Sequence, residues 1–308
     1  NDGSTAGDSF TTAAGSDAAG LGTVISSPFA TITKALQFAT SGDTIYIDAG
    51  TYAETVVIGS DSVSLIGKDS NATVIDPPGS SATAGLYGIY ATNRTGLAVR
   101  DLGVTGAYRG IYFNNVDLSS LTGDSVSSIG EYGVVLGSAD TVTISNCQFN
   151  SNQSGLYIDG ACYTITVTKS IASSNTQRGF EVSGGNHTVD SNTLSSNGLS
   201  AIYMNGVDRT TVSGNTVTSS GNGIELLSGA DTNTITGNTC QSNTNHGFLV
   251  GSSNENTFSG NTVTSNAYGM SFSGGCNGNT LTSNTVSSNT NYGIQLNGSS
   301  RNSVIRNV

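Results

Sequence analysis

A short motif recurs along this chain: a glycine, an apolar residue, a variable residue and a fourth residue that is often apolar. We call this motif the repeated phrase. Ten copies occur, beginning at Gly88, Gly110, Gly133, Gly155, Gly179, Ala201, Gly223, Gly247, Gly269 and Gly293. Successive copies start 22 to 24 residues apart. Self-similarity with a period of roughly 20–50 residues is typical of repeat architectures. The pattern therefore predicts one structural unit per copy.

Within each copy, two further short runs with strand-like alternation follow the opening phrase. They are clearest in 234–243 and 257–266, where Thr and Ser alternate with Ile, Cys, Phe and Val around Gly-Asn turns. Three short strands per 22–24 residues, each separated by a turn, predict a coil that stacks on its neighbours. We therefore expect an all-β fold, a right-handed parallel β-helix with three strands in each coil.

A column of asparagines supports the same period. Asn192, Asn215, Asn238, Asn261, Asn284 and Asn307 are each 23 residues apart. Stacked side-chain amides can hydrogen-bond to the coils above and below them. We interpret this column as a structural ladder at an inward-facing turn.

The chain before the regular repeats has a different pattern. Residues 1–27 are polar and lack a clear period, which predicts an irregular lead-in to a β-helix domain at 28–308. Residues 28–40 predict a capping helix, with Ser27 as its N-cap, Pro28 in its first position and Gly42 as its stop. Strands are expected at 44–47, 55–58, 62–66 and 73–75, with turns between them at 48–50 and 66–68, and regular coils from about 86.

The composition limits the classes of binding partner that we expect. The net charge of −11 argues against a nucleic-acid partner. No apolar run approaches the ~18 residues of a membrane-spanning helix, so membrane insertion is not expected. A Ser-, Thr-, Asn- and Gly-rich acidic surface favours an extracellular or cell-surface protein. The chain has four cysteines, Cys147, Cys162, Cys240 and Cys276. They are expected in distant coils, or on opposite sides of the core of one coil, which is too far apart for disulfides. We interpret all four as free and buried.

Two stretches resemble known families. The segment Pro28–Ile32 with Gly42–Glu54 resembles the N-terminal cap of family 9 polysaccharide lyases and related surface proteins. The later Gly-Ile, Asn-x-Val and Ser-Asn repeats resemble NosD-type and sugar-hydrolase repeats of the pectate-lyase-like superfamily. The resemblance implies the β-helix fold and a carbohydrate ligand. In such lyases an acidic cluster binds calcium, so calcium is the one cofactor to consider, although no acidic cluster is evident and no metal can be named.

The outward positions of the repeated phrase carry the candidate chemistry. Because side chains alternate along a strand, the residue after the glycine should point inward and the next one outward. The outward column gathers tyrosines and a few charges, and tyrosine rings suit sugar binding. Candidate carbohydrate-binding residues are Tyr112, Tyr157, Tyr203 and Asn205. Candidate catalytic residues are Glu181, Glu225, Asp159 and Arg178, with the glutamates two coils apart.

Three functions remain open on the sequence. The preferred one is a secreted or surface β-helix that binds a polysaccharide or cell-surface glycan along the Tyr/Glu face. The second is a lyase or hydrolase that acts on acidic polysaccharide. The third is a structural stalk or adhesin module. The last coil, 301–308, has no evident cap, so we also expect it to contact a further coil or another molecule end to end.

Overall fold

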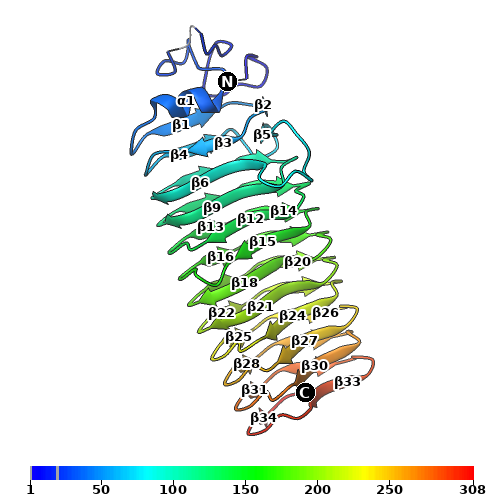
Figure 1. Cartoon of the computed structure of the whole chain (residues 1–308). Helices are drawn as coiled ribbons and strands as arrows, with labels where there is room; N and C mark the ends of the chain where they lie inside the picture. The colour runs from blue at the N-terminus through cyan, green and yellow to red at the C-terminus, as the bar shows by residue number, and fades with distance from the viewer. Residues whose placement is uncertain (1, 19–20) are drawn as a thin grey trace. The chain divides into compact units, whose positions relative to one another are not determined.

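The fold is an all-β parallel solenoid, with turns of about 23 residues. The computed structural model describes residues 2–18 and 21–308. It divides into two compact units, unit 1 (Asn1–Asn152) and unit 2 (Gln153–Val308), which are described separately. In each unit the chain coils so that successive strands join three parallel sheets, here called A, B and C, as the stacked arrows of Figure 1 show.

Unit 1 contains one helix, α1 (Ile32–Phe38), among its described residues, followed by the first coils. Its sheet A is formed, in order, by β1 (Thr44–Ile47), β4 (Ser64–Gly67), β7 (Ala98–Arg100), β10 (Ser120–Thr122) and β13 (Thr143–Ser145). Its sheet B is formed by β2 (Gly50–Tyr52), β5 (Thr73–Ile75), β8 (Gly103–Val104), β11 (Ser125–Ser127) and β14 (Gln148–Asn150). Its sheet C is formed by β3 (Val56–Ile58), β6 (Tyr87–Thr95), β9 (Arg109–Asp117) and β12 (Tyr132–Gly137).

Unit 2 repeats the same three-sheet plan. Its sheet A is formed by β16 (Thr166–Thr168), β19 (Thr188–Asp190), β22 (Thr211–Ser213), β25 (Thr234–Thr236), β28 (Thr257–Ser259), β31 (Thr280–Thr282) and β34 (Ser303–Ile305). Its sheet B is formed by β17 (Ile171–Ser173), β20 (Thr193–Ser195), β23 (Thr216–Thr218), β26 (Thr239–Gln241), β29 (Thr262–Thr264) and β32 (Thr285–Ser287). Its sheet C is formed by β15 (Ser154–Ile158), β18 (Phe180–Gly185), β21 (Ser200–Asp208), β24 (Asn222–Leu227), β27 (His246–Gly251), β30 (Tyr268–Ser273) and β33 (Tyr292–Leu296).

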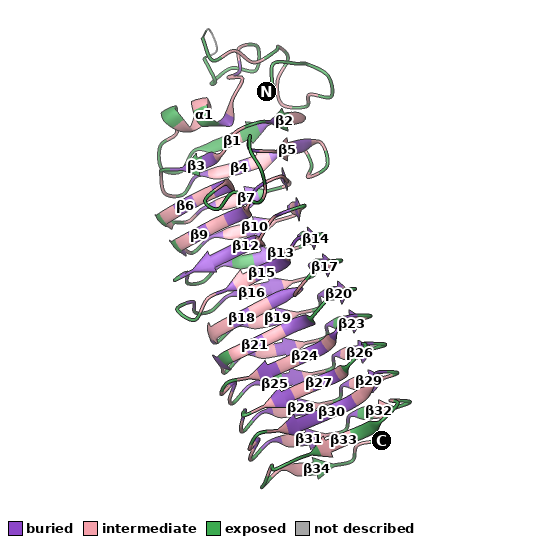
Figure 2. Ribbon diagram, turned by 45° about the vertical axis from the view of Figure 1, so that its right-hand side comes forward, coloured by how far each residue is buried: buried purple, intermediate pink, exposed green. Residues whose placement is uncertain are grey.

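The core lies inside the coils, where the inward residues of the three sheets meet. In sheet C of unit 2, Ile202 pairs with Ile224, which in turn pairs with Phe248, and all three are fully buried. Figure 2 shows this alternation as buried segments between half-buried ones along the strands. The first residue of the repeated phrase has little space for a side chain: a Cβ at Gly223 would lie 2.4 Å from the carbonyl oxygen of Gly247 in the next coil, and the largest residue that occurs at this position is Ala201. The repeated phrase thus marks the place where sheet C begins.

The corners of unit 2 share one design. A residue in the left-handed conformation is followed by a buried polar side chain, as Gly237 (φ 63°) is followed by Asn238. Each buried side chain accepts a hydrogen bond from the backbone N–H of its counterpart in the preceding coil, so the corners stack as ladders. The ladder between sheets A and B consists of Asn192, Asn215, Asn238, Asn261, Asn284 and Asn307.

Two more ladders run along the other corners of unit 2. The one between sheets B and C consists of Asn175, Asn197, Ser220, Asn243, Asn266 and Asn289. The one between sheets C and A consists of His187, Thr210, Asn233, Asn256, Asn279 and Asn302. The sequence analysis singled out only the first ladder, because Ser220 interrupts the asparagines of the second and His187 and Thr210 begin the third.

The N-terminal cap differs from its predicted form. Helix α1 begins at Ile32 instead of residue 28, because the side chain of Thr31 accepts the N–H of Lys34 as N-cap. The carboxylate of Glu54 accepts the N–H groups of Ile32 and Thr33, each at 2.8 Å. The helix ends at Phe38, before Gly42. Ser27 and Pro28 therefore precede the helix and do not cap it.

Other local differences are small. The turn predicted at 48–50 gives way to β2 at Gly50, because Gly50–Tyr52 pairs in register with β5. The strand predicted at 62–66 begins two residues later, at Ser64, and extends to Gly67, within the turn predicted at 66–68. The described lead-in forms no helix or strand, and it is held to the first coil where Asp48 accepts the N–H groups of Ser9 and Phe10. All four cysteines are buried thiols outside any disulfide.

Candidate functional site

The outward face of sheet C in unit 2 aligns the candidate residues on neighbouring strands. Tyr157 on β15 pairs with Glu181 on β18, Glu181 pairs with Tyr203 on β21, and Tyr203 pairs with Glu225 on β24. All four side chains are half-buried. The strand register therefore places one tyrosine between the two glutamates, which lie roughly 9–10 Å apart by the usual strand spacing.

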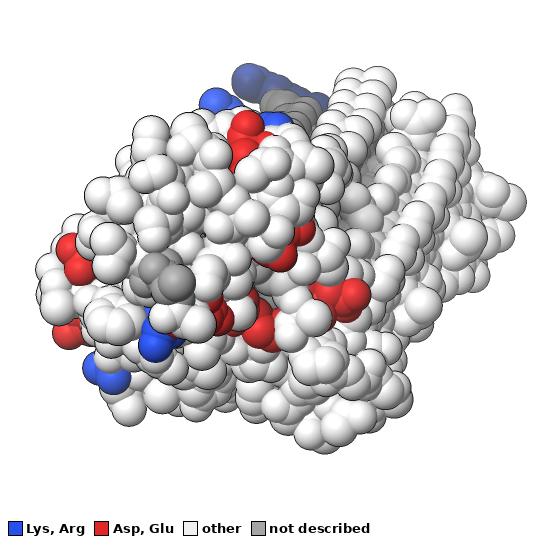
Figure 3. All heavy atoms as spheres, turned by 90° about the horizontal axis from the view of Figure 1, so that it is seen from above, with Lys and Arg blue, Asp and Glu red and all other residues white. Residues whose placement is uncertain are grey.

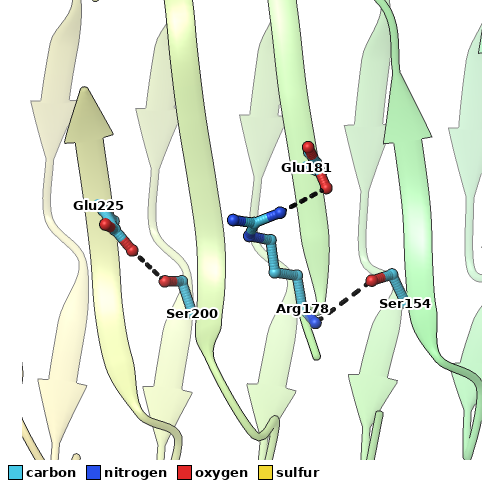
Figure 4. A network of polar contacts seen from close by, with 5 residues as sticks. All are labelled: Ser154, Arg178, Glu181, Ser200 and Glu225. Atoms are coloured by element: carbon cyan, nitrogen blue, oxygen red, sulfur yellow. Dashed lines mark hydrogen bonds and ion pairs between the residues drawn. The ribbon is translucent and has the colours of Figure 1, made fainter. Parts of the chain in front are cut away.

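Arg178, just before β18, joins this row (Figure 4). Its Nη1 donates to Oε2 of Glu181 at 2.9 Å, and its guanidinium lies 3.9 Å from the centroid of the Tyr203 ring. Stacking of a guanidinium on an aromatic face is favourable, most of all when the pair is partly shielded from water. Arg178 thus ties Glu181 and Tyr203 together and covers one face of the tyrosine ring.

Glu225 is held by neutral donors. The hydroxyl of Ser200 donates to its Oε2, as Figure 4 shows, and Nδ2 of Asn222 donates to the same oxygen at 3.2 Å. Asn222 in turn lies 3.2 Å from Nδ1 of His246 on the next strand of sheet C. We call Arg178, Glu181, Ser200, Tyr203 and Glu225 the unit 2 cluster. Its carboxylates differ, since one is paired with a cation and the other is not.

The surroundings set the protonation of two side chains. Burial raises the pKa of the Tyr203 phenol above its ordinary value; Arg178 opposes this shift, and Glu225 and Glu181 add to it. The phenol therefore keeps its proton at neutral pH and remains a hydrogen-bond donor. Burial lowers the pKa of His246, although Glu225 acts in the other direction. A neutral imidazole is thus favoured beside Asn222.

Three other predicted residues have their own local surroundings. Asp159 is in the loop after β15, where its Oδ1 accepts the N–H of Ala161 and the thiol of Cys162. Asn205 is farther along β21, opposite Leu227. Tyr112 belongs to unit 1, where its ring stacks on Tyr90 at 5.7 Å.

Unit 1 carries an aromatic group on its own sheet C. The ring of Tyr87 lies 5.0 Å from Tyr90 and 5.1 Å from Tyr112, and Arg109 lies 5.2 Å from the Tyr112 ring. Arg109 also pairs with Glu131. The Tyr90 and Tyr112 rings are nearly parallel, at 3°, so each covers a face of the other. This arrangement leaves less open ring surface than a flat platform of tyrosines would.

Sequence reasoning missed the residues that hold Glu225. Ser200, Asn222 and His246 occupy the position immediately before the repeated phrase in three successive copies. Strict alternation puts that position, three residues before the outward one, on the opposite side, so the period did not place Ser200 and Asn222 beside Glu225. What the period could not supply is the direction in which each side chain turns.

The described residues provide no ready metal centre. No group of three or more His, Cys, Asp and Glu side chains among them could hold a metal ion. His187 is buried, and its Nδ1 accepts the N–H of Ile165 while its Nε2 lies 2.9 Å from the Ser183 carbonyl oxygen. No calcium ligands are therefore assigned. No helix in the described part of the chain has the length and apolar character needed to cross a membrane.

Solved structures with the same fold include two sugar-acting enzymes. DFA-IIIase from Arthrobacter chlorophenolicus A6 in complex with GF2 has a TM-score of 0.70 and 15% identity over 89% of this chain and 87% of the other. The A-module of mannuronan C-5 epimerase AlgE6 from Azotobacter vinelandii has a TM-score of 0.66 and 16% identity over 90% and 93%. At such identities the likeness shows the fold.

Family membership is decided by sequence. No curated protein matches the chain. A family model described as "Periplasmic copper-binding protein (NosD)" matches residues 69–245 and 221–308, which together cover most of the chain and all of unit 2. The repeats that define the coils are thus the repeats of that family, and the chain belongs to the NosD family of right-handed β-helix proteins.

Proposed function

We propose that this protein binds a polysaccharide on the outward face of sheet C in unit 2, at the unit 2 cluster. The observation that carries the proposal is the alignment of Glu181, Tyr203 and Glu225 on three adjacent strands, with Arg178 stacked on the tyrosine. Sugar ligands are recognised by aromatic surface together with a few fixed polar groups. A face built from parallel strands also offers a long, even surface to a chain-like ligand.

The comparisons support a carbohydrate ligand in general terms. Both structural relatives named above are sugar-acting enzymes on the same solenoid, and the epimerase is named for mannuronan, a polymer. The same fold carries different activities, so the relatives favour a ligand class and leave the chemistry to the residues of this chain.

The family description names copper, and the residues of this chain do not fit a copper site. Copper is bound by imidazole, thiolate and thioether ligands. Here the His187 nitrogens are engaged with backbone groups, Nδ1 of the half-buried His246 lies 3.2 Å from Oδ1 of Asn222, the cysteines are buried, and Met204 and Met270 are buried in the core. We therefore give copper no part in the proposed function. The word "periplasmic" in the family description supports a location outside the cytoplasm, in the periplasm or beyond.

Glycan binding is tested by substitution of Tyr203. We expect Tyr203→Ala to weaken binding of whichever glycan an array identifies at least tenfold, because it removes the aromatic contact and the stack with Arg178. Tyr163→Ala is a matched control, since Tyr163 is an exposed tyrosine in the loop after β15 that contacts Arg209. Calorimetric titration of both variants measures the effect. Equal affinities of the two variants, or no binding to any glycan, would contradict the proposal.

Hydrolysis or elimination is a second candidate, favoured by the two carboxylates that flank Tyr203. Their spacing of roughly 9–10 Å is at the upper end of the ~6.5–9.5 Å found in inverting glycosidases. Reducing-sugar and unsaturated-product assays with the bound glycan address it. If turnover occurs, Glu225→Gln should lower it more than a hundredfold while binding is kept.

A further inference from the structure

The outward face of sheet C in unit 2 is unusually poor in positive charge. Its seven strands contain Glu181, Asp208 and Glu225 but no Lys or Arg. Arg178 stands next to β18 and is the single cation in the unit 2 cluster. A ligand with a carboxylate on every sugar would need several cations along its length, because each buried or bound anion must be compensated.

Arg178 is already engaged. It forms an ion pair with Glu181 at 2.9 Å and stacks on Tyr203 at 3.9 Å, and its side chain is only 25% exposed. A carboxylate on the ligand could use Arg178 only by displacing Glu181, whose side chain is 14% exposed. The charge of the one available guanidinium is thus balanced within the protein before any ligand arrives.

The remaining cations of unit 2 are at the corners of the coils. Lys169, Arg209, Arg301 and Arg306 all adopt the left-handed conformation that ends a strand. Lys169 and Arg306 are at corners between sheets A and B, and Arg209 and Arg301 are at corners between sheets C and A. The repeat therefore places these four charges at corners, outside the strands that carry the unit 2 cluster; Arg209, the nearest in sequence, follows the end of β21.

Glu225 gives the unit 2 cluster a net negative charge. Its Oε2 accepts hydrogen bonds from Ser200 and Asn222, both neutral, and no Lys or Arg of the described residues forms an ion pair with it. A carboxylate accepts hydrogen bonds well from hydroxyl groups. The same carboxylate repels a ligand carboxylate, and the net charge of −11 adds to this repulsion at long range.

We propose that the glycan bound at the unit 2 cluster is an uncharged polymer, recognised through its hydroxyl groups, and not a polyuronate. The inference rests on the proposed function, since it assigns the ligand class of the same site. Tyr203 supplies a phenol donor and a ring, Glu225 supplies acceptors, and the outward row continues with the uncharged side chains Leu249, Ser271 and Gln295.

The test compares polymers that differ mainly in charge. Polygalacturonate is paired with fully methyl-esterified polygalacturonate, mannuronan with mannan, and chitosan with chitin oligosaccharides, each titrated at 20 mM and 200 mM NaCl as chosen test conditions. We expect an uncharged member to bind at least tenfold more tightly than its charged partner, with little dependence on salt. Glu225→Gln should narrow the gap to the anionic partner at least threefold, and Tyr163→Ala should leave it unchanged.

The outcomes separate the two proposals. Tighter binding of polygalacturonate or mannuronan, weakened by salt, would overturn the uncharged-glycan inference while leaving glycan binding intact. Tighter binding of chitosan than of chitin would also overturn it, in favour of a cationic sugar. Failure of every polymer to bind would overturn the proposed function, and this inference with it.

Discussion

At the scale of single residues, the buried polar side chains carry the specificity of the fold. Most accept hydrogen bonds from the coil before them, and Asp124 in unit 1 does so too, but it is a carboxyl group. It is fully buried at a corner between sheets A and B, where its Oδ1 accepts the N–H of Leu102 and its Oδ2 has no hydrogen-bond partner. Burial, with a contribution from Asp101, raises the pKa of Asp124 to about 8. In most coils of unit 2 the corresponding place is taken by asparagine.

Asp124 should therefore make stability depend on pH. Its folded-state pKa of about 8 exceeds the unfolded value near 3.9. The native state thus keeps a proton that the unfolded state loses, and stability falls as pH rises from about 4 to about 8. We expect Asp124→Asn to be more stable than the wild type at pH 8 by about 1–3 kcal/mol, with a smaller difference at pH 5. Urea unfolding at both pH values measures it, and parallel pH profiles would contradict it.

At the scale of elements, a corner of the coil is built from two residues, a left-handed one and a buried ladder residue. The second satisfies backbone groups that the turn leaves without a strand partner. Asn238, for example, accepts the backbone and side-chain N–H groups of Asn215 and donates to the Val212 carbonyl oxygen and to Asn261. The ladder thus fixes the coil spacing at each corner.

The ladder between sheets A and B predicts a large effect of truncation. We expect Asn238→Ala to lower the free energy of unfolding by about 2–4 kcal/mol, because several buried groups lose their partners and the cavity cannot admit enough water to replace them. Asn245→Ala is the matched control, since Asn245 is exposed, and it should cost less than ~0.5 kcal/mol. Denaturant unfolding compares the two. A similar loss in both variants would show that the ladder bonds contribute little.

Most of these strands and turns could be predicted from the period of the sequence. Particular residues explain why the other features could not. Ile202 and Tyr203 could be assigned to inside and outside from alternation alone, because a repeat imposes one register on every coil. The start of α1 could not, because Glu54, distant in sequence, supplies the acceptors that fix it. The pairing of Arg178 with Glu181, and not with Glu225, also needed the structure, because the period does not give the direction in which a long side chain extends.

At the scale of the whole molecule, negative charge and donor placement both limit what the protein can bind. Acidic groups are spread over the face seen in Figure 3, with basic groups mainly at its margin and rows of uncharged side chains beyond. The side chains that could bind a soft metal ion through nitrogen or sulfur are equally dispersed. The described chain has two histidines, four cysteines and two methionines, and the solenoid spreads them over several coils, with Met270 and Cys276 in the same one. A repeat that gives each coil its own core does not gather such residues.

This dispersion predicts that the native protein retains no copper, despite its family. Burial raises the pKa of the Cys147 and Cys240 thiols, which disfavours the thiolate that binds metals. His187 has both ring nitrogens within hydrogen-bond distance of backbone groups. We expect less than 0.1 equivalent of copper per chain after loading with Cu(I) or Cu(II) and desalting, a threshold set here for the test. We also expect thiol reagents to react fully only after unfolding, which serves as the control. One retained equivalent in the folded protein, lost on His187→Gln or His246→Gln, would show instead that these side chains rearrange to form a site.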